Sequence, residues 1–204
     1  MTWVDQVFYD SAATTDFTPF LTKLLGEKPD IIDFSASPTG SAALICKTAR
    51  GLGFTGILSY GGKTAAADMV KIAGQDALEG VLTTNLPLLP PQVSDVVIGL
   101  PARETAKYGA AYGNTWDFYS QASIMIAAMK RANSVDSTAV RNILQDSTQK
   151  WPYVAINGGV ATFGSAVAQQ VYGANNASHQ LYCSWPICII RGGKDTIGAI
   201  ITPP

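Results

Sequence analysis

The sequence predicts an α/β fold built on a doubly wound, mostly parallel β-sheet. Over the first 85 residues, short apolar runs that are typical of buried strands alternate with amphipathic helical patterns. Short loops join these patterns, which favours parallel βαβ units with right-handed crossovers, covered on both faces. After residue 85 the pattern changes, and we expect an incomplete second lobe of helices followed by a C-terminal hairpin.

The first 85 residues are expected to hold four strands and three helices. The first helix begins near Asp16 or Thr18, carries Pro19 in its first turn and ends at Gly26. Its apolar residues recur at the spacing of one helix face and are Phe17, Phe20, Leu21, Leu24 and Leu25. The other expected elements are strands at 7–9, 30–34, 56–59 and 80–84 and helices at 41–52 and 64–73. The inward residues of the 41–52 helix are expected to be Ala42, Ile45, Ala49 and Leu52.

The segment 86–101 is predicted to be an inter-lobe linker, because its Leu-Pro-Leu-Leu-Pro-Pro run suits neither a helix nor a central strand. Beyond it, helices are expected at 102–108, at 116–131 and from Asp136 or Ser137 through Asp146. Residues 124–129 are apolar all round the helix, so we expect this half to be buried on every side. Near the C-terminus, the runs 187–191 and 194–201 flank Gly192-Gly193, which predicts a hairpin.

Composition excludes several classes of function. The chain has 204 residues, 47% hydrophobic and 14% charged, with a net charge of −1 and basic residues that are scattered, so we expect no nucleic-acid partner. No apolar run reaches the ~18 residues of a membrane helix. The first residues lack the basic and apolar regions of a signal peptide, so we expect no export signal in this chain. The three cysteines, Cys46, Cys183 and Cys188, have no metal-ligand spacing, and a disulfide between the last two is not expected.

Several stretches, taken in order, resemble a known family. They are Thr-Asp-Phe-Thr-Pro-Phe-Leu at 15–21, Lys-Pro-Asp-Ile-Ile at 28–32, Ser-Pro-Thr-Gly-Ser-Ala-Ala-Leu-Ile-Cys-Lys-Thr-Ala-Arg-Gly-Leu-Gly-Phe at 37–54 and Ala-Gly-Gln-Asp-Ala-Leu-Glu-Gly-Val-Leu at 73–82. Together they resemble the second lobe of type I periplasmic solute-binding proteins, the leucine/isoleucine/valine-binding receptors of ABC transporters. Lys-Tyr-Gly at 107–109, the 116–131 helix, Thr-Phe-Gly at 162–164 and Tyr-Gly-Ala-Asn at 172–175 resemble the segment that returns to the first lobe.

The resemblance implies a periplasmic protein that binds a small solute between two lobes and delivers it to an ABC transporter permease. It implies that residues 1–85 form the α/β ligand-binding lobe, 86–101 the linker, and 102–204 the helices and strands of the other lobe and hinge. Complete members carry an export signal and a first-lobe half, and an earlier second-lobe strand with its loop, none of which is present here. The chain therefore resembles a fragment or one half of a split receptor, and its expected partner is a complementing first-lobe half or a second copy.

Two loops at expected strand ends are candidate ligand sites, because solutes bind outside the carboxyl ends of parallel strands. In the first loop, 35–41, Ser37, Thr39 and Gly40 offer hydroxyls and helix N-terminal N–H groups that suit a small anion. Ordinary turn and cap residues are the alternative. The family commonly has an aromatic residue near Ser37 or Pro38, so the small side chains here indicate a bulkier or differently oriented ligand.

In the second loop, 59–64, Tyr60 can stack on a ligand or donate its hydroxyl, and Gly61 permits close approach of the backbone. A half-exposed residue at the rim is the alternative for Tyr60. The family has an acidic residue near the position of Gly61 that pairs with the ligand's ammonium group. Its absence makes an acid, an amide or an aromatic solute as plausible here as an amino acid.

No enzyme signature is found. Nucleophile-elbow, zinc-protease, Walker and dinucleotide glycine motifs are absent, so we expect no catalytic residue, metal or cofactor. His179, the single histidine, is expected to be a surface or interface residue. Two hypotheses are favoured: a solute-binding half of a transport receptor, and a regulatory half that acts through dimerisation of exposed apolar surface. An unrecognised α/β enzyme is the third and least favoured.

Overall fold

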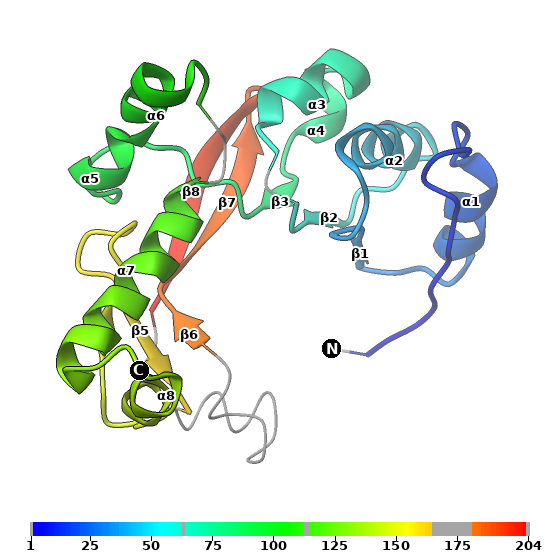
Figure 1. Cartoon of the computed structure of the whole chain (residues 1–204). Helices are drawn as coiled ribbons and strands as arrows, with labels where there is room; N and C mark the ends of the chain where they lie inside the picture. Colours follow the sequence, from blue (N-terminus) through cyan, green and yellow to red (C-terminus); the bar gives the residue numbers. More distant parts are fainter. Residues whose placement is uncertain (1, 63, 112–114, 165–180, 203–204) are drawn as a thin grey trace. The chain divides into compact units, whose positions relative to one another are not determined.

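The structure is a computed structural model that describes residues 2–62, 64–111, 115–164 and 181–202 (Figure 1). Contacts divide the chain into two compact units. The first comprises Met1–Pro87 and Pro186–Ala199, and the second comprises Leu88–Trp185 and Ile200–Pro204. The C-terminal hairpin thus groups with the N-terminal residues. The expected division into a lobe at 1–85, a linker at 86–101 and a returning part at 102–204 stays a prediction.

The first unit contains a mixed sheet of five strands in the order β1-β2-β3-β7-β8 (Figure 1). The strands β1 (Ile31–Asp33), β2 (Ile57–Tyr60) and β3 (Leu82–Thr83) are parallel neighbours, and β7 (Trp185–Arg191) pairs antiparallel with β3. β8 (Lys194–Ile201) follows at the far edge. This arrangement confirms the predicted α/β class with a sheet rich in parallel strands. The hairpin is also confirmed, and Gly192 and Gly193 both have positive φ, at 55° and 74°.

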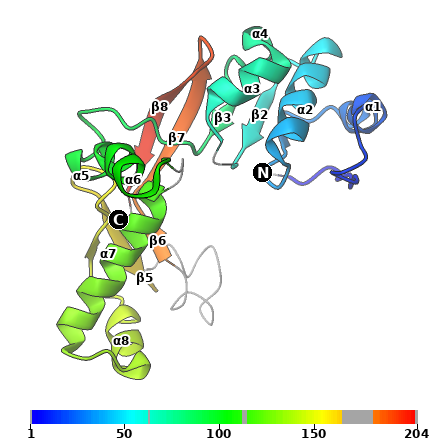
Figure 2. The ribbon, with the colours of Figure 1, turned by 45° about the horizontal axis from the view of Figure 1, so that its top comes forward.

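Four helices pack on one face of this sheet: α1 (Thr18–Gly26), α2 (Thr39–Gly51), α3 (Ala66–Ala73) and α4 (Gln75–Leu78) (Figure 2). Alternation along the strands sends Ile32 and Leu58 into the core beneath these helices. Ile31 and Ile57 on the opposite face remain 38% and 43% exposed. Helical cover was expected on both faces, and the described residues of this unit provide it on one, because all four helices share a single layer.

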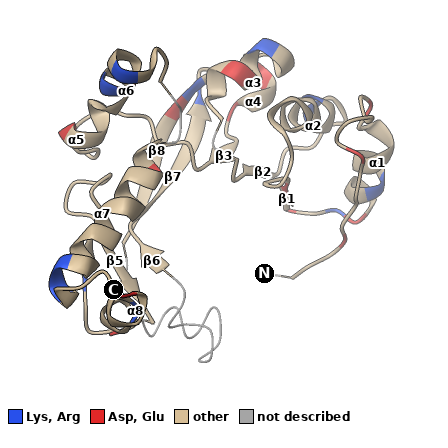
Figure 3. Ribbon diagram, viewed as in Figure 1, with Lys and Arg blue, Asp and Glu red and all other residues tan. Residues whose placement is uncertain are grey.

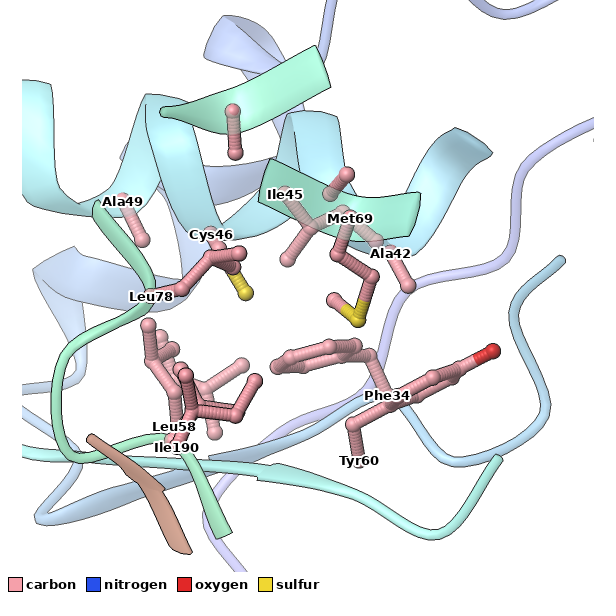
Figure 4. Packing of buried hydrophobic residues seen from close by; sticks show 14 of the residues in the cluster. Phe34, Ala42, Ile45, Cys46, Ala49, Leu58, Tyr60, Met69, Leu78 and Ile190 are labelled. Carbon is pink, nitrogen blue, oxygen red and sulfur yellow. The ribbon is translucent and has the colours of Figure 1, made fainter. Parts of the chain in front are cut away.

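The core of the first unit forms where α2 and α3 meet the strands. Ala42, Ile45 and Ala49 face inward from α2 as predicted, and Leu58 and Ile190 meet them from β2 and β7 (Figure 4). Leu52 was expected to join them, but it is 42% exposed. The reason is that α2 ends at Gly51, so Leu52 lies after the last residue whose direction the helical period fixes.

The expected strand at 7–9 is not formed. Residues 2–10 contain neither helix nor strand, although Tyr9 packs edge-on against Phe17 at 5.0 Å between ring centroids. A β-strand needs a neighbour with which to exchange backbone hydrogen bonds, and no described strand lies beside this segment. The prediction of a buried strand at 7–9 is therefore wrong: Phe8 is 83% exposed, and Val7 and Tyr9 are only half-buried.

The second unit combines helices with a three-stranded antiparallel sheet in the order β4-β5-β6. The helices are α5 (Asp95–Ile98), α6 (Leu100–Tyr108), α7 (Thr115–Ala132) and α8 (Ser137–Leu144), and the strands are β4 (Trp151–Pro152), β5 (Val160–Phe163) and β6 (Leu181–Cys183). Asp136 caps α8 by accepting hydrogen bonds from the Thr138 and Ala139 N–H groups, as predicted. The segment 86–101 is more structured than a plain linker, since it contains α5 and the start of α6.

The long helix α7 is only partly buried. Trp116, Ile124 and Ala128 point into the second unit, where α7 packs against α8 and β4. Met125 and Ile126 are 42% and 53% exposed, so the expectation that residues 124–129 are buried on every side is wrong. The described elements of this unit cover one side of α7 and leave the other apolar side open.

Candidate functional site

The candidate site lies at the carboxyl ends of β1, β2 and β3. These strands are parallel neighbours, so the loops that follow them emerge at the same edge of the sheet. The first loop runs from Phe34 to Pro38 and leads into α2, and the second follows Tyr60 and leads into α3. Ser35, Ala36 and Pro38 are exposed, so the first loop is at the surface and not packed into the interior.

Direct hydrogen bonds join the two loops. The Ser35 hydroxyl accepts from the Gly61 N–H at 2.8 Å and donates to the Asp33 carboxylate at 2.8 Å. The Thr39 and Thr64 hydroxyls lie 2.7 Å apart and share a hydrogen bond. These contacts hold the hydroxyls of both loops at one place, although the loops are more than twenty residues apart in sequence.

Tyr60 is a core residue, not a residue of the rim. It is 3% exposed, and its ring stacks on Phe34 with 5.6 Å between centroids and 12° between planes (Figure 4). The alternative of a half-exposed rim residue is therefore wrong. The hydroxyl points away from the aliphatic side chains of the core (Figure 4). The ring thus anchors the end of β2, and the hydroxyl is the part of Tyr60 that remains for polar contact.

Glycine is required at positions 61 and 62 by close packing. A Cβ atom on Gly61 would lie 2.8 Å from the Ser35 hydroxyl oxygen, and one on Gly62 would lie 2.1 Å from the Tyr60 ring. In contrast, a Cβ atom on Gly40 would meet nothing within 4 Å. Open space therefore lies over the first turn of α2, whose Pro38 cap makes no side-chain hydrogen bond to the helix.

Asp195 is a residue of this edge that sequence reasoning missed. It reaches from β8 to accept hydrogen bonds from the Ala66 N–H at 2.9 Å, the Asn85 amide at 2.8 Å and the Thr83 hydroxyl at 3.3 Å. Ala65, at the cap position of α3, has no side chain that can do this. The carboxylate thus supports the loop before α3, and no local motif marks a residue so distant in sequence.

A cavity of the first unit adjoins this edge. Its volume is about 500 Å³, and its lining is mainly apolar, from the N-terminal segment, α1, β1, α2 and the whole first loop from Phe34 to Pro38. Of the predicted site residues, half-buried Ser37 lines this cavity, whereas Thr39, Gly40, Tyr60 and Gly61 do not. Ser37 thus lies in the wall of this cavity together with Ser35, while Thr39 and Gly61 take part in the hydrogen bonds that join the two loops.

The described residues give little support to metal binding, to a membrane span or to thiol chemistry. They hold no group of three or more metal-ligating side chains, and none of their helices is long and apolar enough to cross a membrane. Burial raises the pKa of the Cys46 thiol to about 12, and burial together with the Asp195 charge raises that of Cys188 to about 12. Both thiols are thus protonated at neutral pH and poor nucleophiles.

Charged side chains are scattered over both units (Figure 3). Lys63, His179 and the 172–175 stretch lie outside the described residues.

Comparison with known families decides the assignment. A family model described as periplasmic binding protein matches residues 1–175, most of the chain. The chain belongs to this family. The predicted resemblance to receptors of ABC transporters is confirmed, and with it the type of fold.

Solved structures with the same fold include several relatives of the family. A leucine-binding protein, LivK, from Thermotoga maritima has a TM-score of 0.63 and 22% identity; the match covers 98% of this chain and 52% of that chain. A branched-chain amino acid ABC transporter protein from Thermus thermophilus, solved with bound valine, has a TM-score of 0.57 and 19% identity, covering 92% and 50%. LivJ from Streptococcus pneumoniae, in complex with isoleucine, has a TM-score of 0.55 and 18% identity, covering 94% and 50%.

This chain spans about half the length of these structures. At such identities the likeness shows the fold alone, so the solutes of these relatives are not carried over to this chain by the comparison. The comparison with curated proteins found no match.

Proposed function

We propose that this chain is a solute-binding part of an ABC transporter receptor and that it acts without catalysis. The proposed ligand is an amino acid, an amide or a small organic or aromatic acid. The proposed location of the chain is the periplasm, and the proposed partner is an ABC transporter permease. The observation that carries the proposal is the joined pair of loops at the carboxyl ends of β1 and β2, held by the Ser35–Gly61 and Thr39–Thr64 hydrogen bonds.

The residues proposed to meet the solute are Ser37, Thr39, Gly40, Tyr60 and Gly61. The open space over Gly40 and the first turn of α2 suits a carboxylate or carbonyl oxygen, because N–H groups of that turn point outward. Hydroxyls from Thr39 and Tyr60 supply further hydrogen bonds. The expected second wall belongs to the half of the relatives' length that this chain does not span, and closure between two walls is what stabilises the bound state.

A thermal-shift screen of amino acids, amides and aromatic acids tests this function on the chain combined with a family first-lobe polypeptide. At about a hundredfold excess over Kd, a bound solute adds about 2.7 kcal/mol of stability, roughly 5–11 °C in Tm. Thr39→Val keeps the side-chain shape but removes the hydrogen bond to Thr64, and we expect about tenfold weaker solute binding.

Thr55→Val is the matched control, because Thr55 is exposed and precedes β2, at the end of the strand opposite to the loops. It should leave solute affinity unchanged. A screen in which no solute raises the Tm of the combined polypeptides would remove the receptor assignment.

A second candidate function is a ligand-sensing half that acts by forming a dimer of this chain. The favouring observation is an apolar stripe on α7 formed by Phe118, Ala122, Met125 and Ile126, all exposed. These residues recur at one helix face, and a continuous exposed apolar face is typical of interaction surfaces. Light scattering tests it: Ile126→Asp should give a monomer and Val135→Asp, at an exposed position outside α7, should not. A wild-type chain that stays monomeric at high concentration excludes this candidate.

A further inference from the structure

The loop after β3 forms a third part of the edge at which the first two loops meet. Thr84 follows β3 directly, and its hydroxyl donates to the Gly61 carbonyl at 3.0 Å, so this loop is tied to the second one. Asn85 comes next, and its side chain is half-buried. None of the residues proposed to meet the solute belongs to this loop, so the role of its polar side chains is a separate question.

The Asn85 side chain is held beside the second loop by Asp195. Its amide nitrogen donates to the Asp195 Oδ2 at 2.8 Å, and the Ala66 N–H at the start of α3 donates to the same oxygen at 2.9 Å. Two donors that share one acceptor atom lie close to each other. The Asn85 amide therefore lies next to the first turn of α3, where the second loop ends.

The Asp195 carboxylate also fixes which way the Asn85 amide is turned. An ionised carboxylate only accepts hydrogen bonds, so the amide NH₂ group must face it and the amide oxygen, Oδ1, must face away. In the part of the chain that the structure describes, this oxygen accepts no hydrogen bond. It is therefore available as an acceptor for a donor group on a bound molecule.

The charge of Asp195 makes this acceptor stronger. The partners of Asp195 are all neutral donors: the Ala66 N–H, the Thr83 hydroxyl and the Asn85 amide. No lysine or arginine among the described residues forms an ion pair with Asp195. A hydrogen bond to a carboxylate polarises the amide and increases the negative charge on its oxygen. The negative potential at this place favours a cationic or N–H-donating group of a solute and disfavours a second anion.

We propose that Asn85 is a specificity-determining residue of the solute site and accepts a hydrogen bond from a nitrogen of the solute. Asp195 is its positioning residue, because it orients and polarises the amide. The solute class is thereby narrowed to molecules with an ammonium or amide N–H group, such as amino acids and primary amides, over carboxylic acids that lack one. The inference rests on the proposed function and adds a rule of selection to it.

Matched pairs of solutes test the rule on the chain combined with a family first-lobe polypeptide. The probes are the standard L-amino acids and simple primary amides, each compared with the acid of the same carbon skeleton without nitrogen. L-phenylalanine is thus compared with 3-phenylpropanoate, and benzamide with benzoate. Isothermal titration calorimetry gives the Kd of both members of every pair in which either raises the Tm. The nitrogen-bearing member should bind at least about tenfold more tightly.

Two variants test the residues through the ratio of the two Kd values in a pair. Asn85→Leu keeps the approximate size of the side chain but removes the acceptor, and it should reduce the ratio about tenfold. Asp195→Asn keeps an acceptor for the Ala66 N–H but removes the charge, and it should reduce the ratio about threefold or more. Asn142→Leu, at an exposed position of α8, is the matched control and should keep the wild-type ratio.

The results separate this inference from the function on which it rests. If no solute of either kind raises the Tm, the proposed function fails and the inference fails with it. If acids without nitrogen bind as tightly as their partners, the inference is overturned while solute binding stands. It is also overturned if the variants weaken both members of a pair equally, because a purely structural role has that effect. Circular dichroism shows whether each variant folds, and Asp195→Asn decides if Asn85→Leu does not.

Discussion

Asp195 is a single carboxylate that organises the candidate edge of the first sheet through hydrogen bonds to the chain itself. It accepts from the first N–H of α3 and from two side chains at the end of β3, Thr83 in the strand and Asn85 after it. A negative charge at a helix N-terminus is favourable because the helix dipole and the free N–H groups there carry partial positive charge. Asp195 therefore fixes the loop that contains Gly61 and Thr64.

Asp195→Ala should lower the free energy of unfolding by about 1–3 kcal/mol, because it leaves the Ala66 N–H and two side-chain donors without an acceptor. Urea denaturation followed by circular dichroism measures this. Asp30→Asn, at an exposed position, should stay within about 0.5 kcal/mol of wild type. Equal stability of the two variants would mean that Asp195 does not cap α3.

At the scale of single elements, the sequence predicted the features that depend on residues only a few positions apart. The period of Phe17, Leu21 and Leu24 placed α1, and Gly192-Gly193 placed the hairpin of β7 and β8, because helix faces and two-residue turns are encoded within a few residues. The strand at 7–9 was wrong, because pairing depends on a neighbour that the local pattern does not specify. Asp195 was missed for the same reason, since it contacts Thr83 across 112 residues.

The candidate site was predicted in part: its two loops were predicted, but the packing of Tyr60 was not. Strand–loop–helix alternation was enough to name the two loops that the structure joins. The burial of Tyr60 against Phe34 was not predictable, because it depends on the register of β1 against β2 and on the layer of helices above them.

A comparison of Leu58 with Leu52 tests whether the core ends where α2 ends. Leu58 is fully buried in β2, whereas Leu52 is 42% exposed just after α2. Leu58→Ala should cost about 2–5 kcal/mol of unfolding free energy, and Leu52→Ala should cost less than about 0.5 kcal/mol. Chemical denaturation gives both values, and comparable losses would show that Leu52 is packed inside as the helical period had predicted.

At the scale of the whole molecule, exposed carboxylates give stability a common pH dependence. The Thr18 N–H lowers the pKa of Asp16, the Gly192 N–H followed by Arg191 lowers that of Glu79, and the Thr148 hydroxyl followed by Gln149 lowers that of Asp146. A carboxyl whose pKa is lower when folded stabilises the fold above its unfolded pKa. That stabilisation is lost as the pH falls through the folded pKa.

The urea midpoint should therefore be constant near neutral pH and fall below about pH 4.5, where these groups take up protons. Measurement at several pH values between about 7 and 3 checks the sign. The combined variant Asp16→Asn, Glu79→Gln and Asp146→Asn should show a shallower acid decline. A midpoint that rises on acidification would contradict the assignment.

The pairing of β3 with β7 has a consequence for biosynthesis. β7 leaves the ribosome about 100 residues after β3, its neighbour in the sheet. At roughly 5–20 residues per second this interval lasts about 5–20 s. During that time the nascent sheet ends at β3 with an unfilled edge, and Asp195 has not yet been synthesised. This chain should thus depend on cellular holdases more than a domain whose neighbouring strands are consecutive, because long-range pairing is slow and exposes aggregation-prone edges.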